Sequence, residues 1–158
     1  MIGRHFRAGV GTVIHRSNGE VALFRRQVPP IGTWQFQQGG IDAGESVETT
    51  LWRELAEETG LSREDFSSVA EYPEWTLQVY PTEILNSPNQ PNPDRLGQVH
   101  KWFYLKLKDG IEIDLATATD HEFNDVKWVS WEEALTVPPP YKVHVYQELY
   151  EYFKENIS

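Results

Sequence analysis

The stretch from residue 46 to residue 60 constrains the fold most, because it specifies both ends of one helix. Ser46 is a good N-cap residue, since its hydroxyl can accept a hydrogen bond from the first turn of a helix. Gly60 can adopt the left-handed conformation in which helices commonly end. We therefore predict a helix over residues 47–59.

Three acids on this helix lie where an ordinary amphipathic helix would be apolar. At about 100° per residue, Glu54, Glu57 and Glu58 fall within a wedge of roughly 100°, and Glu58 lies almost over Leu51. Hard divalent cations prefer oxygen ligands, and such ions can bridge phosphate oxygens and lower the pKa of a bound water. We interpret this face as the wall of a cation-binding cavity. For an isolated E-x-x-E-E, a solvated acidic face paired with Arg and Lys would be the better explanation.

Strand and helix patterns alternate along the rest of the chain, so we predict a single mixed α and β domain over residues 1–158. Strands are expected at 7–15, 21–25, 75–80, 99–107 and 126–131, with a short helical turn at 62–66 and an amphipathic final helix at 141–156. Ser130 has the spacing of a capping box for another helix. Residues 86–94, rich in Pro and Asn, are expected to form a surface loop.

Charge and composition exclude several kinds of site. The net charge of −10 argues against an extended nucleic-acid-binding surface, and action of an acidic protein on phosphates would point towards a bound metal. Without cysteine there is no disulfide or thiolate metal site, and the five histidines have no zinc-ligand spacing. No apolar run approaches a membrane span, and the N-terminus lacks a signal-peptide core. We expect a cytoplasmic protein with no membrane partner; the sequence specifies no oligomeric state.

The residues around the acids resemble the Nudix box, G-x5-E-x7-R-E-U-x-E-E-x-G-U, where U is a bulky aliphatic residue. Every defined position matches, and the matching residues are Gly39, Glu45, Arg53, Glu54, Leu55, Glu57, Glu58, Gly60 and Leu61. The resemblance implies an α/β fold, an α/β/α sandwich with a mixed central sheet and a catalytic loop-helix-loop. It also implies an enzyme that hydrolyses phosphoanhydride bonds.

The same resemblance assigns roles within the box. It implies that Glu54, Glu57 and Glu58 bind Mg²⁺ or Mn²⁺. A backbone carbonyl at Gly39 or Gln38 is expected to help. By the same resemblance, Arg53 and Glu45 support the catalytic geometry through an ion pair, and Gly60 is structural.

Three segments resemble the branch of the family that contains bacterial RNA pyrophosphohydrolases and dinucleoside polyphosphate hydrolases. They are 34–42 (WQFQQGGID), 97–103 (GQVHKWF) and 122–129 (EFNDVKWV). The first segment departs from the usual pattern at Gln37, where a proline is typical. We expect this change to alter the stiffness of a loop more than the chemistry.

The branch also suggests residues outside the box. The acid at Glu122 would reach the metals from a loop, and either Glu57 or Glu122 is the candidate general base. Substrate-binding positions are matched by Arg7, Arg26, Thr33, Gln38, Tyr141 and Lys142. Tyr141 could stack on a base, although packing of the final helix onto the sheet explains it equally well. For any one of the cations alone, a surface role is about as good an explanation.

Three hypotheses about function follow. The first is a Mg²⁺-dependent RNA 5′ pyrophosphohydrolase, in which water attacks the polyphosphate chain and a 5′-monophosphate end remains. The second is a dinucleoside polyphosphate hydrolase, with diadenosine tetraphosphate as the example. The third is a nucleotide-binding sensor with little turnover. The intact set of acids argues against the sensor, because a protein freed from catalysis has no physical reason to keep Glu58 beside an apolar stripe.

Overall fold

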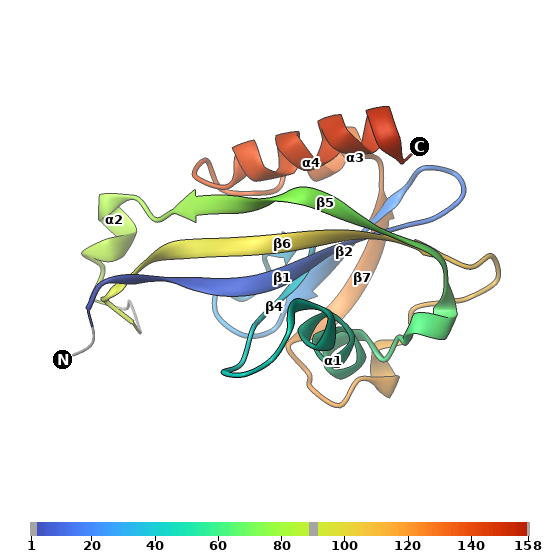
Figure 1. Cartoon of the computed structure of the whole chain (residues 1–158), viewed down its shortest axis with the longest axis horizontal. Coiled ribbons are helices and arrows are strands. Elements are labelled where there is room, and N and C mark those ends of the chain that lie inside the picture. Colours follow the sequence, from blue (N-terminus) through green and yellow to red (C-terminus); the bar gives the residue numbers. More distant parts are fainter. Residues whose placement is uncertain (1–2, 89–91, 158) are drawn as a thin grey trace.

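A seven-stranded mixed sheet forms the centre of the computed structural model, which describes residues 3–88 and 92–157 (Figure 1). The strands are β1 (His5–His15), β2 (Val21–Arg26), β3 (Trp34–Gln35), β4 (Gln37–Gly40), β5 (Phe66–Val79), β6 (Arg95–Leu107) and β7 (Phe123–Val129). The main order is β3-β2-β1-β6-β5, while β4 also pairs with β1 and β7 with β2. Only the β1–β6 pair is parallel among the described strands, so the predicted mixed sheet is confirmed.

Helices cover both faces of this sheet (Figure 1). The helices are α1 (Val47–Thr59), α2 (Thr82–Leu85), α3 (Trp131–Ala134) and α4 (Val143–Asn156), with 3₁₀ turns η1 (Arg63–Asp65) and η2 (Leu115–Thr117). One buried cluster joins the sheet to α3 and α4, and a second joins the opposite face to α1. The α/β/α sandwich is therefore confirmed. No helix in the described ranges combines the length and the apolar character needed to cross a membrane.

The ends of α1 are those that the sequence predicts. The Ser46 hydroxyl accepts a hydrogen bond from the Thr49 N–H at 3.1 Å. Gly60 has a φ of 77°, and its N–H donates to the Ala56 carbonyl. Because both ends are fixed by local hydrogen bonds, the acids of α1 keep a defined rotation relative to the sheet.

Strand β1 contributes side chains to the packing on both faces of the sheet. It pairs with β6 along its length and with β4 from Gly9 to Thr12. Val10 packs in the α1 cluster and Val13 in the α4 cluster. Since side chains alternate along a strand, Thr12 faces α1 with Val10.

Several predicted boundaries are wrong. Strand β5 begins at Phe66 rather than residue 75, and β6 begins at Arg95 rather than residue 99. The sequence patterns predict neither β3 nor β4. The polar first half of β5 carries no strand pattern; its pairing with β6 makes it a strand. Part of the predicted loop over 86–94 lies outside the described residues, at 89–91.

Candidate active site

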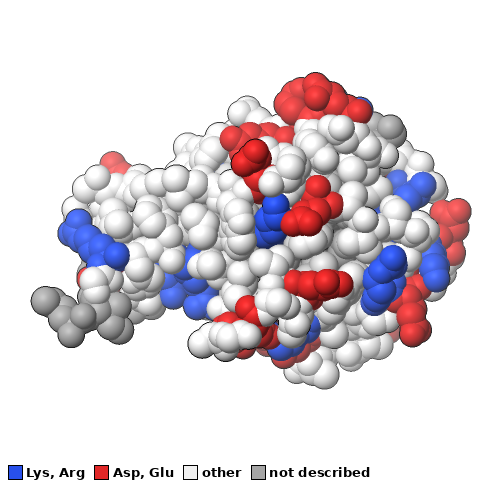
Figure 2. All heavy atoms as spheres, in the orientation of Figure 1, with Lys and Arg blue, Asp and Glu red and all other residues white. Residues whose placement is uncertain are grey.

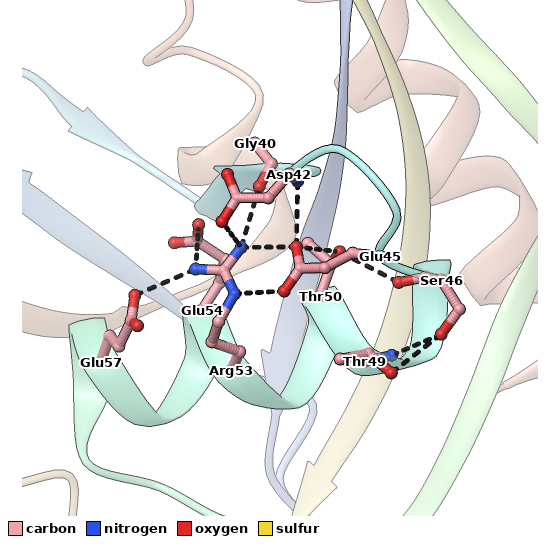
Figure 3. Close-up of polar contacts among 9 residues, drawn as sticks. All are labelled: Gly40, Asp42, Glu45, Ser46, Thr49, Thr50, Arg53, Glu54 and Glu57. Carbon is pink, nitrogen blue, oxygen red and sulfur yellow. Dashed lines mark hydrogen bonds and ion pairs between the residues drawn. The ribbon is translucent and has the colours of Figure 1, made fainter.

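The Arg53 guanidinium joins α1 to the loop that precedes the helix (Figure 3). Both carboxylate oxygens of Glu45 accept hydrogen bonds from it, with 2.8 Å between Nη2 and Oε1. Arg53 also donates to the Gly40 carbonyl at 3.2 Å. Its Nη1 donates to Glu54 at 2.9 Å and to Glu57 at 3.1 Å. The predicted Arg53–Glu45 ion pair is present, and it ties the loop to the helix that carries the acids.

Glu45 and Arg53 are both charged at neutral pH. Hydrogen bonds from Arg53 and then from the Asp42 N–H lower the pKa of Glu45 to about 2. The hydrogen bond to Glu45 in turn raises the pKa of Arg53 above its ordinary value. Neither group is suited to exchange a proton near neutral pH, so the pair is a structural element of the site.

Glu58 is buried among acids. It is 2 % exposed, and its carboxylate neighbours are Glu54 and Glu122. Burial, and then Glu122, raise the pKa of Glu58 to about 11, and burial also raises the pKa of Glu54. A cation among these oxygens would favour their ionised forms.

A neutral amide also contacts Glu58. Gln37 was expected to influence the stiffness of a loop, but it lies in strand β4. Its Nε2 donates to Oε2 of Glu58 at 2.8 Å. The residue at which the WQFQQGG segment departs from its pattern therefore lies against a predicted metal ligand.

The loop before β7 brings Glu122 to the same place. Its Oε1 accepts a hydrogen bond from Arg26 Nη1 at 3.0 Å. The Asp120 N–H donates to the Glu57 carbonyl at 2.8 Å, which fastens this loop to the end of α1. Asp120 lines the same site as these acids. Sequence reasoning missed it, although its place two residues before Glu122 was an available signal.

These acids line a cleft of about 310 Å³, which we call the acidic cleft. Its lining residues are Arg7, Ala8, Gly9, Arg26, Gln38, Gly39, Gly40, Glu54, Glu57, Glu58, Gln98, His100, Asp120 and Glu122. A Cβ on Gly39 would overlap the Glu54 carboxyl group, and one on Gly40 would overlap the Arg7 guanidinium. Glycine at both positions therefore lets these two side chains lie directly against the backbone of β4.

Carboxylate and carbonyl oxygens in this cleft are the donor types that a hard divalent cation prefers. Within the described ranges, no three acids or histidines already converge as ligands of one ion. Arg53 engages both Glu54 and Glu57. A bound cation would have to compete with this guanidinium for the oxygens of both acids.

A second cleft, of about 500 Å³, adjoins the first, and we call it the aromatic cleft. It shares Arg26, Gln38 and Gln98 with the acidic cleft. Its remaining lining residues are Pro30, Thr33, Trp34, Gln35, Gln78, Tyr80, Ile84, Val137, Pro138, Pro139, Tyr141, Lys142 and Tyr146. All six predicted substrate-binding residues thus line one or both of the two clefts.

Lys142 is the buried cation of the aromatic cleft. It is 6 % exposed, and its Nζ donates to Gln38 Oε1 at 3.1 Å. Burial, and then the charge of Arg26, lower its pKa to about 8. Lys142 thus lies near the junction of the two clefts, and most of it is charged at neutral pH.

Tyrosine rings line the same cleft. Tyr141 is half-buried and meets Tyr80 edge to face, with 5.9 Å between the ring centroids. The Thr33 hydroxyl donates to the Pro30 carbonyl at 2.8 Å. Tyr80, Gln98 and His100 were missed as lining residues. For the last two, the match at 97–103 was a signal that could have found them.

Comparisons with known proteins agree with the family that the sequence motif suggests. A family profile described as NUDIX domain matches residues 5–153. The chain is 38% identical to the RNA pyrophosphohydrolase of Pseudoalteromonas translucida, over 94% of this chain and 84% of the relative. It is 37% identical to the RNA pyrophosphohydrolase of a Nitratiruptor species, over 96% of each. A C. elegans Ap4A hydrolase binary complex superposes with a TM-score of 0.68 at 19% identity, over 94% of this chain and 98% of that structure, so it is similar in fold.

Proposed function

Because the chain belongs to the Nudix family and is a hydrolase of phosphoanhydride bonds, we propose that its substrate is the 5′ end of RNA. It converts a 5′-triphosphate or 5′-diphosphate to a 5′-monophosphate. The observation that carries this proposal is the junction of the two clefts at Arg26, Gln38 and Gln98. A polyphosphate in the acidic cleft continues into a cleft with tyrosine rings, which suit an unstacked first nucleotide. Both bacterial relatives are RNA pyrophosphohydrolases by name, which supports the same substrate.

Nudix hydrolases generally need a divalent metal ion, and we propose Mg²⁺, with Mn²⁺ as a substitute. Glu54, Glu57 and Glu58 would hold it from α1, with Glu122 from the loop before β7 and the carbonyl of Gly39 from β4. When bound, the ion neutralises phosphate charge and lowers the pKa of a coordinated water.

Side chains of the two clefts carry out the remaining steps of the reaction. Arg7, Arg26 and Lys142 hold the phosphate oxygens, because cationic donors bind them strongly. Water attacks a phosphorus, its proton passes to Glu57 or Glu122, and the bond to the leaving phosphate breaks. The products are monophosphorylated RNA and pyrophosphate, or phosphate released stepwise.

Other residues position these groups or the nucleotide. Arg53 and Glu45 keep α1 fixed to its loop, so that the acids hold their places. Gln38 supports Lys142 through a hydrogen bond, and Thr33 lines the aromatic cleft. Tyr141 stacks on the first base, with Tyr80 as the neighbouring wall.

One experiment tests the substrate. Rates are compared on 5′-triphosphate RNA, 5′-diphosphate RNA and diadenosine tetraphosphate at one Mg²⁺ concentration. We expect kcat/KM to be highest for an RNA end. A clear preference for diadenosine tetraphosphate would replace RNA by the dinucleotide, which could place one adenine in the aromatic cleft. No release from any substrate would favour the sensor or a different Nudix substrate.

A further inference from the structure

Gln37 connects the sheet to the most buried acid of the site. It is 1 % exposed and lies in β4, directly opposite Thr12 of β1. Both side chains face α1, on the side of the sheet where Glu58 is buried. The three residues therefore form a buried row from β1 to α1.

Hydrogen bonds give this row a direction. The Thr12 hydroxyl donates to Gln37 Oε1 at 2.7 Å, and Gln37 Nε2 donates to Glu58 Oε2 at 2.8 Å. With its carbonyl oxygen held by Thr12, the amide can present only its NH₂ group to Glu58. An ionised carboxylate is purely an acceptor, so this orientation fits the charged form of Glu58.

We propose that Gln37, oriented by Thr12, is a positioning residue that holds Glu58 as a ligand for the divalent cation. Glu58 also lies beside the acids Glu54 and Glu122, which repel its negative charge. At Glu54, the positively charged Arg53 competes with a cation for the carboxylate. The neutral amide of Gln37 fixes the carboxylate of Glu58 without such competition. The proposal rests on the proposed function in one respect, namely that Glu58 binds the cation.

Two variants test this row: one removes both hydrogen bonds, and the other removes only the bond from Thr12 to Gln37. Gln37→Met keeps the length of the side chain and removes the amide, while Thr12→Val keeps the shape and removes the hydroxyl. Thr76→Val is the matched control. Its hydroxyl is also buried in the sheet, but it accepts from Trp102 Nε1 at 2.8 Å, on the face opposite α1.

Mn²⁺ binding is measured without substrate, by electron paramagnetic resonance of the free ion, and thermal unfolding is measured without metal. Loss of a partner behind a metal ligand typically weakens metal binding about 10- to 100-fold. We expect Gln37→Met to raise the Mn²⁺ Kd by about that factor and Thr12→Val to raise it less. Thr76→Val should lower Tm and leave the Kd unchanged. The kcat of Gln37→Met should recover at saturating Mn²⁺.

The possible results separate this proposal from the proposed function. Equal Mn²⁺ affinity in wild type, Gln37→Met and Thr12→Val would overturn the role of Gln37 and leave the proposed function unaffected. No Mn²⁺ binding by the wild type would overturn both. If Gln37→Met fails to fold, Thr12→Val decides, because it leaves the glutamine in place and changes only its orientation.

Discussion

The acidic cleft and the aromatic cleft share three residues, yet the chain builds them in different ways. The acidic cleft takes three of its five acids from one stretch of α1, at Glu54, Glu57 and Glu58. The aromatic cleft collects its walls from the ends of β2, β5 and β6 and from the segment between α3 and α4. Most acids of the first cleft are thus close together in sequence, whereas the walls of the second cleft come from distant segments.

This difference suggests a division of labour. Acids on one helix keep their relative positions as long as the helix is intact, which suits a reaction that needs fixed oxygen ligands. Walls made of loops and strand ends can change independently of one another, which suits the choice of substrate. Substitutions in the acidic cleft should therefore lower kcat, and those in the aromatic cleft should raise KM.

The largest effect is expected from Glu57→Gln, which keeps the shape and removes the charge. Loss of a general base typically lowers kcat about 10²- to 10⁴-fold, and loss of a metal ligand adds to this. The rate on triphosphorylated RNA at saturating Mg²⁺ measures it, with Glu48→Gln on the exposed first turn of α1 as the control. Full activity in Glu57→Gln would remove this residue from the catalytic assignment, and Glu122→Gln would then be tested as the base.

Lys142→Met tests the other side of the comparison. A hydrogen bond to a charged group is worth enough that its loss should lower kcat/KM about 10- to 100-fold, mainly through KM. Lys108→Met, in an exposed turn, is the control. If kcat falls instead while KM stays the same, the two clefts do not divide the work as proposed.

The pH dependence of Lys142 gives a finer test. Burial lowers its pKa to about 8, so the charged form that attracts phosphate exists below that pH and is lost above it. The kcat/KM of the wild type should therefore fall as the pH rises through about 8. Lys142→Arg should retain its charge and move this fall to higher pH. Identical pH profiles for the two proteins would assign the titration to another group.

Tyr141→Ala should have the smallest effect, because the ring is half-buried and Tyr80 remains beside it. Base stacking is worth on the order of 1 kcal/mol or more, so we expect a KM increase of roughly fivefold for RNA. The inhibition constant of inorganic tripolyphosphate, which has no base, should stay unchanged. A matching loss for tripolyphosphate would instead indicate that Tyr141 packs α4 onto the sheet.

Features that depend on residues close in sequence were also easier to predict than features that depend on distant segments. The bounds of α1 could be predicted because its caps are local in sequence, and the Arg53–Glu45 pair could be predicted from the resemblance to the Nudix box. The polar half of β5 and the short β4 could not, because their hydrogen bonds go to strands far along the chain. The assignment of residues 1–158 to one domain stays a prediction; the family profile covers 5–153.

The sequence by itself indicated the chemistry of this protein, because the period of one helix places Glu54, Glu57 and Glu58 on a common face and the whole Nudix box around them matches. Tertiary structure alone decided what surrounds them. Pairing of β1 with β4 puts Gln37 against Glu58, and the loop before β7 adds Asp120. On the face shown in Figure 2, lysines and arginines occur in separate small groups among the acids rather than as one basic surface. Under the proposed function, recognition of a phosphate chain would depend on a few cations that folding brings to the two clefts.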